Sequence, residues 1–365
     1  MKTDVTIDEI LSFGVEEEFV LADMSTRFTA PRAAEVLDKA RPQLGEHAQR
    51  EFYATQVEFT TEPCMSAEQL RSELVRARQI GAAASAAAGC LLVAAASAVL
   101  TRRPLPITAD ARYELIAERY TAGISSEISG CHVHVGTLPR EEAILLGNHL
   151  RPWLPVLQAL CVNSPFAAQQ DRHCSSWRYF DVKALPTVEP APMLDEAAYE
   201  RMADSLTTDG PLLDRKMIYW YSRPSEHCPT LEIRIADANP DLDLVLLYAV
   251  LLRGLATTLL AEARDGRPWP DMHGSRLEKF HRWVAMDGLR AWAHDPDTGA
   301  LLPSGTLLSR LVHRSRPGLA AAGDEQLADR LLRRFWERGT VADRQRAVYG
   351  RRGRWTDVVD SLVVR

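Results

Sequence analysis

Acidic residues, histidines and one arginine recur at every second position in four short segments of this sequence. The segments are Phe13–Val20, Gln56–Thr60, Cys131–Val135 and Leu231–Asp237. A β-strand repeats every two residues, so alternate side chains share one face. If the four strands are neighbours in one sheet, one face is apolar core. The other face then carries a candidate reaction surface, which consists of Glu16, Glu18, Glu58, His132, His134, Glu232 and Arg234.

Four carboxylates on one face form a hard, oxygen-rich site that suits Mg²⁺ or Mn²⁺ better than zinc. Carboxylates packed together repel one another, so they need a cation or a proton between them. Protein-bound magnesium usually completes its shell with phosphate oxygens and water. Arg234, two residues after Glu232, would then reach a phosphoryl group in transfer. The pattern predicts ATP chemistry without a P-loop, because the sequence has no GxxxxGK[ST] motif and no GxGxxG near a strand.

Some of these residues also fit simpler interpretations. Any one segment alone is compatible with a strand that has a solvated face. Glu and Asp are depleted from strands, however, and four such segments coincide, which favours a functional surface. His132 and His134 fit either metal ligands or substrate contacts. Arg223, which precedes Pro224, fits either a carboxylate or phosphate contact or a surface ion pair.

Other polar and aromatic residues are expected to be structural. The run Tyr219–Tyr221 is more typical of core than of a base-stacking platform. Arg112 and Arg119 fit solvated positions of a helix. The remaining histidines are scattered along the chain, and we expect them at the surface.

The composition is that of a soluble globular protein, with 46% hydrophobic and 25% charged residues. A net charge of −6 gives no reason to expect a nucleic acid or an anionic membrane as partner. The six cysteines include no CxxC pair, which argues against a zinc site or a disulfide scaffold. The N-terminus lacks the pattern of a secretory signal, and the Ala-rich stretch 81–99 fits a buried helix and strand. The expected location is the cytoplasm.

The elements that must position the acidic residues are spread along the chain. Ser66-Ala-Glu-Gln69 is a capping box that should open one helix, and Pro152 and Pro155 should split another. Residues 163–193 look like a long loop region over the sheet. The expected strands are 12–22, 51–61, 90–97 and those around His132 and Glu232. The expected helices are 31–41, 66–88, 110–120, 140–162, 194–206, 242–264 and a C-terminal helical part broken near 294–304 and 316–324. Because the acidic residues come from strands so far apart, we expect one domain, 1–365, with an α+β fold and a largely antiparallel sheet.

Several motifs together resemble the bacterial carboxylate–amine ligases, also called glutamate–cysteine ligase 2, within the glutamate–cysteine ligase superfamily. The resemblance covers nearly the whole chain in the right order. It is specific as a set, although no single motif is. The motifs are Gly14–Phe19, the Glu58 strand, Gly130–Gly136, Asn163–Pro165, Arg223-Pro224, Thr230–Asp237 and Gly339–Arg346.

The resemblance implies a glutamine-synthetase-like catalytic core, which is a curved antiparallel sheet flanked by helices. It also implies an ATP-dependent reaction in which a carboxylate becomes an acyl phosphate and an amine then displaces phosphate. Glutamate and cysteine are the default substrates. By this resemblance Glu16, Glu18, Glu58 and Glu232 hold divalent cations, and Arg234 stabilises the phosphoryl group. His132 lies near the phosphates or the metal. The expected substrate- or nucleotide-binding residues are His134, Asp171, Arg178 and Arg223.

One segment departs from the family pattern. After Asn163-Ser-Pro165 the family carries a Gly-Arg-Asp-Thr-Gly type motif, whereas this chain reads Ala167-Ala-Gln-Gln-Asp-Arg-His-Cys174, so that only Asp171 fits. We expect this region to shape substrate choice. Two alternatives stay open, a phosphotransferase on the same fold and a catalytically idle homologue that binds nucleotide or amino acid. A homo-oligomer is compatible with the sequence, which gives no direct evidence of oligomeric state.

Overall fold

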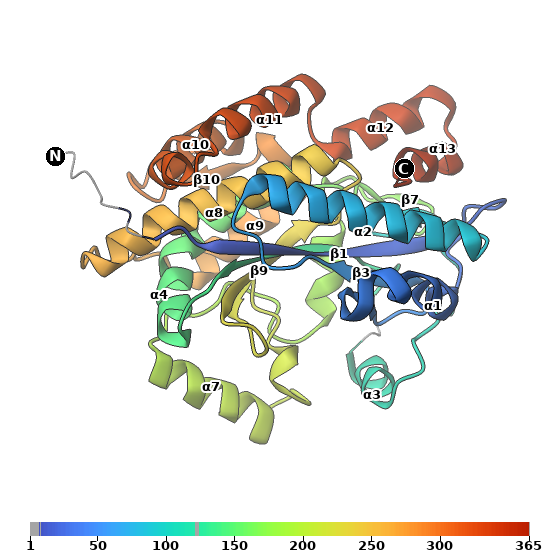
Figure 1. The fold of residues 1–365 in the computed structure, drawn as a ribbon, viewed down its shortest axis with the longest axis horizontal. Coiled ribbons are helices and arrows are strands. Elements are labelled where there is room, and N and C mark those ends of the chain that lie inside the picture. The colour runs from blue at the N-terminus through green and yellow to red at the C-terminus, as the bar shows by residue number, and fades with distance from the viewer. Residues whose placement is uncertain (1–6, 8, 121–123, 365) are drawn as a thin grey trace.

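A seven-stranded antiparallel sheet forms the centre of the protein (Figure 1). The computed structural model describes residues 7, 9–120 and 124–364. The strand order is β2-β3-β1-β5-β9-β8, and β4 pairs with the end of β1. The seven strands are β1 Ser12–Asp23, β2 Ala48–Arg50, β3 Gln56–Thr60, β4 Cys90–Val93, β5 Gly130–Gly136, β8 Ser222–Pro224 and β9 Thr230–Asp237.

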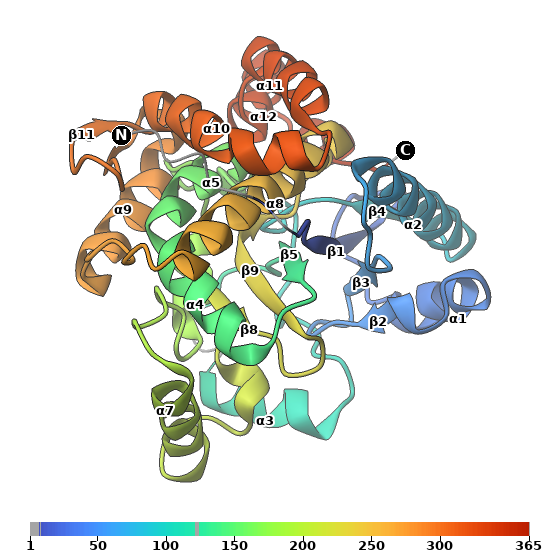
Figure 2. The same cartoon turned by 60° about the vertical axis from the view of Figure 1, so that its left-hand side comes forward.

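Helices cover one face of this sheet, and shorter elements border the other. Figures 1 and 2 show α2, α8 and the C-terminal helices on one side and α3 and α7 on the other. Two small hairpins are β6 Phe166–Ala167 with β7 Gln170–Asp171, and β10 Trp292–His294 with β11 Leu301–Pro303. The helices are α1 Ala33–Leu44, α2 Ala67–Ala87, α3 Ala111–Tyr120, α4 Arg140–Leu150, α5 Leu154–Cys161, α6 Arg178–Asp181, α7 Glu196–Thr208, α8 Leu242–Arg264, α9 Gly274–Asp287, α10 Ser304–Ala321, α11 Glu325–Arg338, α12 Val341–Arg352 and α13 Trp355–Ser361.

The central helix α8 is long and apolar enough to cross a membrane by length and composition alone. However, 94% of its apolar window is buried inside the protein. It packs against α10, α4 and α11 and against the core face of the sheet. It is therefore the buried core helix that the sequence predicted over 242–264. The predicted α+β fold with an antiparallel sheet is confirmed.

The core face of the sheet holds one acidic residue among apolar side chains. Val15 and Phe19 of β1 are buried, but Glu17 lies between them and forms two hydrogen bonds with Arg78 of α2, at 2.6 and 2.9 Å. Arg78 also donates to the backbone carbonyls of Asn239 and Pro240. A buried charge of this kind is tolerated because its partner satisfies it. Glu17 is thus structural, although it lies between two acidic residues of the other face.

The predicted helix and strand boundaries hold in part. The capping box at Ser66 is present and opens α2, and the prolines split residues 140–161 into α4, a 3-10 turn and α5. The predicted strand 51–61 is wrong in its first half. A turn closed by Gln56 N–H and the Tyr53 carbonyl separates β2 from β3. Strand 90–97 ends at Val93, because the Ala94 N–H donates to Leu362 outside the sheet.

The break expected near 316–324 is present but shorter. The helix α10 continues through Pro317 to Ala321, and only residues 322–324 separate it from α11. The packing of α10 against α8 outweighs the hydrogen bond that the proline cannot donate. No disulfide joins the six cysteines, all of which are free.

Candidate active site

The strand register places the predicted acidic residues and histidines opposite one another. Glu18 of β1 faces Glu58 of β3, and Glu16 of β1 faces His132 of β5. His134 of β5 in turn faces Glu232 of β9. Directly opposed residues on one face of an antiparallel pair have Cβ atoms about 4.5–5.5 Å apart. The four segments predicted from the sequence are therefore neighbouring strands, and their even-numbered residues form one surface.

The first cluster on this surface consists of Glu16, His134 and Glu232, whose ligand-type atoms all lie within 4.8 Å of one another. His134 Nδ1 lies 2.8 Å from Thr230 Oγ1, and its Nε2 lies 3.1 Å from Glu16 Oε1. With Nδ1–H donated to the threonine, Nε2 presents its lone pair to the cluster. A second hydrogen bond that orients a histidine in this way is typical of metal ligands.

The second cluster consists of Glu18, Glu51 and Glu58. Burial, followed by the charge of Glu18, raises the pKa of Glu51 to about 8. Burial and the charge of Glu16 likewise raise the pKa of Glu58 well above its ordinary value. Three carboxylates this close, one buried and two half-buried, do not all ionise readily unless a cation joins them. The all-oxygen donor set fits Mg²⁺ or Mn²⁺.

Two arginines neutralise Glu232. Arg223 Nε donates to Glu232 Oε2 at 2.9 Å, and Arg234 Nη1 donates to Oε1. Burial opposes ionisation here, but Arg234 and Arg223 together hold the pKa of Glu232 below its ordinary value. The side chain of Arg223 is only 11% exposed, so the alternative of a surface ion pair is wrong. The sequence predicted neither of these two contacts.

His132 lies between the two clusters. Its Nδ1 is 3.4 Å from Glu16 Oε2, and its Nε2 is 3.6 Å from Glu18 Oε1. Burial and the charge of Arg234 lower the pKa of His132, so the ring is neutral near pH 7 in this environment. A neutral imidazole here can accept or donate one hydrogen bond at the centre of the surface.

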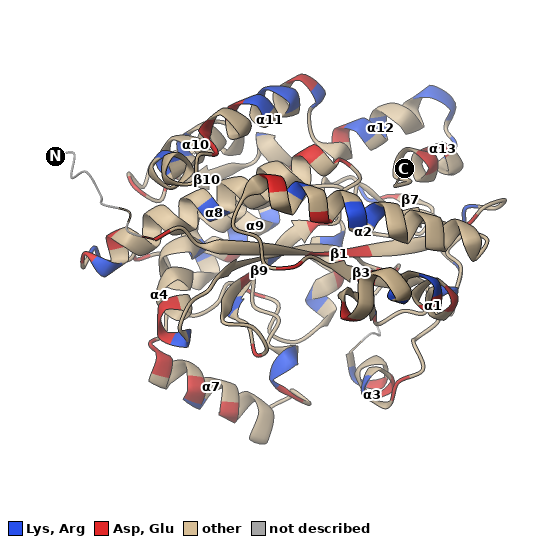
Figure 3. Ribbon diagram, viewed as in Figure 1, with Lys and Arg blue, Asp and Glu red and all other residues tan. Residues whose placement is uncertain are grey.

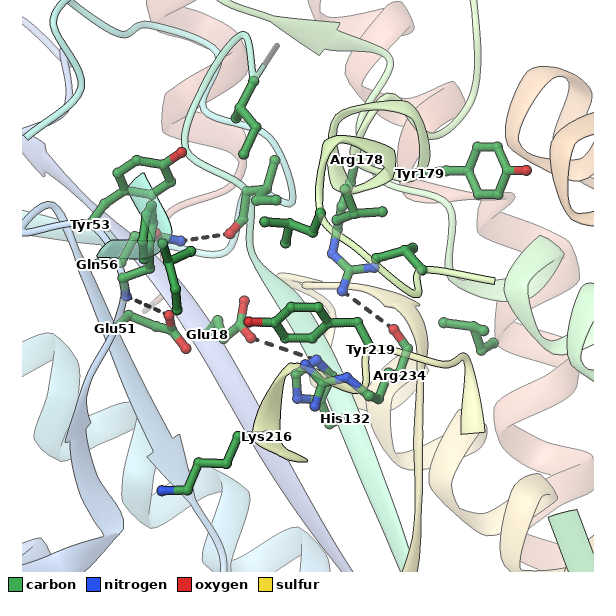
Figure 4. Close-up of a pocket in the computed structure, with 18 of the residues that line it drawn as sticks. Glu18, Glu51, Tyr53, Gln56, His132, Arg178, Tyr179, Lys216, Tyr219 and Arg234 are labelled. Carbon is green, nitrogen blue, oxygen red and sulfur yellow. Dashed lines mark hydrogen bonds and ion pairs between the residues drawn. The ribbon is translucent and has the colours of Figure 1, made fainter. Parts of the chain in front are cut away.

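A cavity of about 240 Å³ opens beside the second cluster (Figure 4). Glu18, His132 and Arg234 line its polar side, where Tyr219 also lies. Its remaining wall comes from α3, from 124–128 and from 182–188. The predicted loop region 163–193 therefore does lie over the sheet and lines the cavity.

Arg178 of α6 reaches this cavity as a buried side chain. Its backbone N–H donates to Ser164 Oγ at 3.1 Å, and its Nη2 makes a long hydrogen bond of 3.4 Å to the Arg234 carbonyl. In the described part of the chain it forms no ion pair. Asp237 lies within electrostatic range, but its carboxylate already accepts hydrogen bonds from Asn163, Ser164 and Ser176.

Gly130 makes room for the Arg178 guanidinium. A Cβ added at this glycine would lie 2.5 Å from Arg178 Nη2 and 2.9 Å from His132 Nε2. Any larger residue would therefore displace one of the two side chains. Because the Gly130 N–H also donates to Glu18 Oε2 at 2.6 Å, this glycine joins Arg178 to the second cluster.

The C-terminal motif anchors the loop that carries Arg178. Gln345 of α12 donates to the carbonyl and the side chain of Asn163. Arg346 donates to both oxygens of Asp171, at 2.9 and 2.8 Å. Asp171 is thus held by α12 and is not among the residues that line the cavity. Its predicted role in binding remains untested, and the structure does not bring it to the other predicted residues.

Two minor expectations need correction. Arg112 lines the cavity and pairs with Asp214 at 2.6 Å, so it is not a solvated helix position, because α3 packs over the site. The core placement of Tyr219–Tyr221 is confirmed, since Trp220 and Tyr221 are buried, although Tyr219 and Tyr221 also line the cavity. Not all remaining histidines are at the surface, since His149 and His281 are buried.

Sequence reasoning missed Glu51 and Gly130 as members of the site. In an unbroken strand that continues to Glu58, the odd-numbered Glu51 would point to the face opposite the acidic residues. The turn at 51–55 interrupts the strand and places Glu51 on the acidic face. An acidic residue beside Phe52 and Tyr53 was the available signal. Gly130 belongs to the motif Gly130–Gly136. A glycine is needed there because the Arg178 guanidinium approaches its Cα closely, and only the fold reveals this contact.

Comparisons with known proteins point to one family over nearly the whole chain. The model of the family "glutamate–cysteine ligase family 2" matches residues 12–363. A protein of Salinispora tropica named "Putative glutamate–cysteine ligase 2" is 37% identical over 353 residues, covering 96% of this chain and 93% of that protein. One of Saccharopolyspora erythraea, named "Putative glutamate–cysteine ligase 2-1", is 38% identical over 359 residues, covering 97% and 94%.

Solved structures with the same fold are more distant in sequence. A glutamate–cysteine ligase of Francisella tularensis in complex with AMP has a TM-score of 0.68 at 13% identity, covering 97% of this chain and 88% of that chain. A bifunctional glutathione synthetase of Pasteurella multocida has a TM-score of 0.60 at 15% identity, covering 91% and 51%. At such identities these two structures are evidence for the fold alone.

Proposed function

This chain belongs to glutamate–cysteine ligase family 2, and from that membership we propose how its acidic surface works. The protein is an ATP-dependent ligase of the glutamate–cysteine ligase type. In the proposed reaction a substrate carboxylate, with glutamate as the default, is activated as an acyl phosphate. An amine then forms the amide, and ADP and phosphate are released. The relatives' names make glutamate and cysteine the first substrates to test.

The two clusters are the proposed cation sites. Glu16, His134 and Glu232 would hold one divalent cation, Mg²⁺ or Mn²⁺, and Glu18, Glu51 and Glu58 would hold another. Such ions neutralise phosphate oxygens and position them for in-line transfer. The raised pKa values of Glu51 and Glu58 support this assignment, because an unpaired buried carboxylate is costly.

The remaining polar residues have proposed roles around these sites. Arg234 donates to the phosphoryl oxygens as charge develops on them. Its half-buried guanidinium is already held in place by Glu232, so little reorganisation is needed. Arg178 binds a carboxylate of the substrate, because it is buried, cationic and without an ion pair in the described part of the chain. Neutral His132 contacts the reacting groups between the clusters.

One observation carries this proposal: two acidic clusters lie on one sheet face beside an arginine and a cavity. Hard cations, a phosphoryl group and a small-molecule substrate can therefore meet within one site. A phosphotransferase would use the same metal and phosphate groups, so only the products separate the two reactions.

The experiment is a phosphate-release screen in which carboxylates, beginning with glutamate, are paired with a panel of amines, ATP and Mg²⁺. The proposal expects ADP, free phosphate and an amide, and it expects phosphate release to need both substrates. ADP without free phosphate would indicate a kinase, and no turnover with any pair would indicate an idle homologue. Glu16→Gln and Glu51→Gln should each raise the Mg²⁺ concentration needed, whereas exposed Glu62→Gln should not.

A further inference from the structure

The far wall of the cavity is strongly apolar. Six aliphatic side chains line it, and they come from α3, from the segment before β5 and from the chain after α6; they are Ile116, Ile124, Ile128, Val182, Leu185 and Val188. The rings of Tyr53, Tyr113, Tyr179 and Tyr221 line it as well. A cavity of about 150 Å³ with walls of this kind holds benzene. The 240 Å³ here exceeds what the side chain of cysteine needs.

The number of available cations that line the cavity limits how many substrate carboxylates it can neutralise. Four described cations line it, namely Arg112, Arg178, Lys216 and Arg234. Arg112 pairs with Asp214, and Arg234 pairs with Glu232. Lys216 is exposed, and Figure 4 draws its amine apart from the other labelled cations. Of these four, only Arg178 is both buried and without an ion pair in the described structure.

One available guanidinium can bind one carboxylate. Glutamate would place its reacting γ-carboxylate at the clusters and its α-carboxylate on Arg178. A second amino acid, such as cysteine, would then bring another α-carboxylate to a wall of aliphatic and aromatic side chains. Burying that charge without a partner is costly. An amine that lacks a carboxylate avoids this cost and gains from burial of its apolar group.

We infer that the nucleophile of this ligase is a primary amine without a carboxylate and with an aryl-sized apolar group, an arylalkylamine in chemical class. This inference rests on the proposed ligase function and specifies its second substrate. The amine nitrogen forms a bond with the acyl carbon while the bond from that carbon to the phosphate oxygen breaks. The amine's proton leaves with the phosphate, so the products are an amide and hydrogen phosphate.

The test compares amines with the amino acids that differ from them only by the carboxylate. The pairs are phenethylamine with phenylalanine, tyramine with tyrosine, and cysteamine with cysteine, each with glutamate, ATP and Mg²⁺. The full chain is used, and kcat/KM is measured by amide formation. In the first two pairs the amine should exceed its amino acid by at least about tenfold, and phenethylamine should exceed cysteamine by at least about tenfold.

A cavity variant tests where the selectivity lies. Leu185 lines the cavity and is half-buried, so Leu185→Trp should fill space that the aryl group needs. The ratio of kcat/KM for phenethylamine to that for methylamine should fall by at least about tenfold. This ratio does not depend on the fraction of folded enzyme. Leu115→Trp, at an exposed position on α3 outside the cavity, should leave the ratio unchanged.

Hydroxylamine separates failure of this inference from failure of the proposed function. It captures an acyl phosphate as a hydroxamate without needing an apolar pocket. If glutamyl hydroxamate forms but cysteine or another amino acid is the preferred nucleophile, the ligase function stands and the arylalkylamine is overturned. If neither hydroxamate nor ADP forms with any pair, the proposed function fails and this inference fails with it.

Discussion

At the scale of single residues, the charge balance around Glu232 links the proposed metal and phosphoryl roles of the site. Its two oxygens are bonded by Arg223 and Arg234, while a carboxylate offers about four lone-pair positions. The same oxygens can therefore also face a cation of the first cluster. This arrangement holds Arg234 rigid at the point where phosphoryl charge would develop.

Removing that guanidinium is the first prediction. Arg234→Ala should lower kcat by about two to three orders of magnitude, because a fixed donor to developing charge is lost. Arg234→Lys should recover only part of the rate, since one ammonium cannot reproduce the planar fork. ADP formation at saturating substrates is the readout. A kcat near that of the parent protein in Arg234→Ala would remove this residue from the chemistry.

The second prediction concerns the space that Gly130 leaves for the Arg178 guanidinium. A Cβ at position 130 would lie 2.5 Å from the Arg178 guanidinium, so Gly130→Ala should displace it. We expect KM for the carboxylate substrate to rise by about 10- to 100-fold, which is the loss of one charged hydrogen bond. Arg178→Met should raise KM similarly. Gly147→Ala, whose nearest contact would be Leu231 at 3.6 Å, is the control. An unchanged KM in Arg178→Met would show that this arginine binds no carboxylate.

The two-residue repeat of strands explains which site residues could be predicted from the sequence. The two-residue repeat correctly grouped Glu16, Glu18 and Glu58, because their strands are regular where they pair. It could not place Glu51, since the turn at 51–55 resets the alternation. Long-range bonds such as that between Arg346 and Asp171 leave no periodic signal, so the true partner of Asp171 was not predictable.

At the scale of elements, local rules predicted helix ends better than strand ends. The capping box opens α2 through a contact of Ser66 with Gln69, and such contacts are local. The end of β4 instead depends on Leu362, which accepts from Ala94 across most of the chain. Strand limits of this kind follow from tertiary pairing, which a single sequence does not reveal.

The crossing of α8 and α10 gives a third prediction. A Cβ at Gly318 would lie 2.1 Å from the Gly254 carbonyl oxygen, whereas nothing lies within 4 Å of one at Gly350 on α12. Gly318→Ala should lower the free energy of unfolding by about 1–3 kcal/mol through overpacking. Gly350→Ala should raise it by about 0.4–1 kcal/mol, because alanine is the better helix former. Urea unfolding measures both, and equal effects of the same sign would contradict the proposed close crossing.

At the scale of the whole molecule, the site joins segments from nearly the full length of the chain. Segments from Glu16 to Glu232 supply the clusters, and α12 near the C-terminus fixes the loop that carries Arg178. Figure 3 shows charged residues of both signs distributed over the helices. The sequence was sufficient to predict the α+β fold and its antiparallel sheet. It could not predict the cavity, because that space depends on how α3 and the 182–188 segment pack over the sheet.

A buried histidine gives the fourth prediction, on pH and stability. His281 is fully buried, its Nδ1 lies 2.5 Å from Gln158 Oε1, and burial lowers its pKa well below the ordinary value. The unfolded chain therefore binds a proton near pH 6.5 that the folded protein rejects. Stability should be complete above that pH and fall as the pH decreases below it.

His281→Gln should remove this part of the pH dependence. The difference in the free energy of unfolding between pH 7.5 and 5.5 should shrink by about 1.4 kcal/mol relative to the parent protein. Urea unfolding at the two pH values provides the measurement. His313→Gln, at an exposed position of α10, controls for the loss of an imidazole from the surface. An unchanged difference in His281→Gln would mean that the pKa of His281 is the same in the folded and unfolded states, which contradicts this prediction.

The most direct test of the central claim follows the oxygen atoms of the carboxylate. Glutamate labelled with ¹⁸O in both γ-carboxylate oxygens is incubated with the enzyme, ATP, Mg²⁺ and an accepted amine, or hydroxylamine as the universal nucleophile. Formation of an acyl phosphate requires that one labelled oxygen leave with the phosphoryl group. The account therefore predicts released phosphate that carries one ¹⁸O, observed by ³¹P NMR or mass spectrometry. Amide or hydroxamate formation with unlabelled phosphate would contradict it.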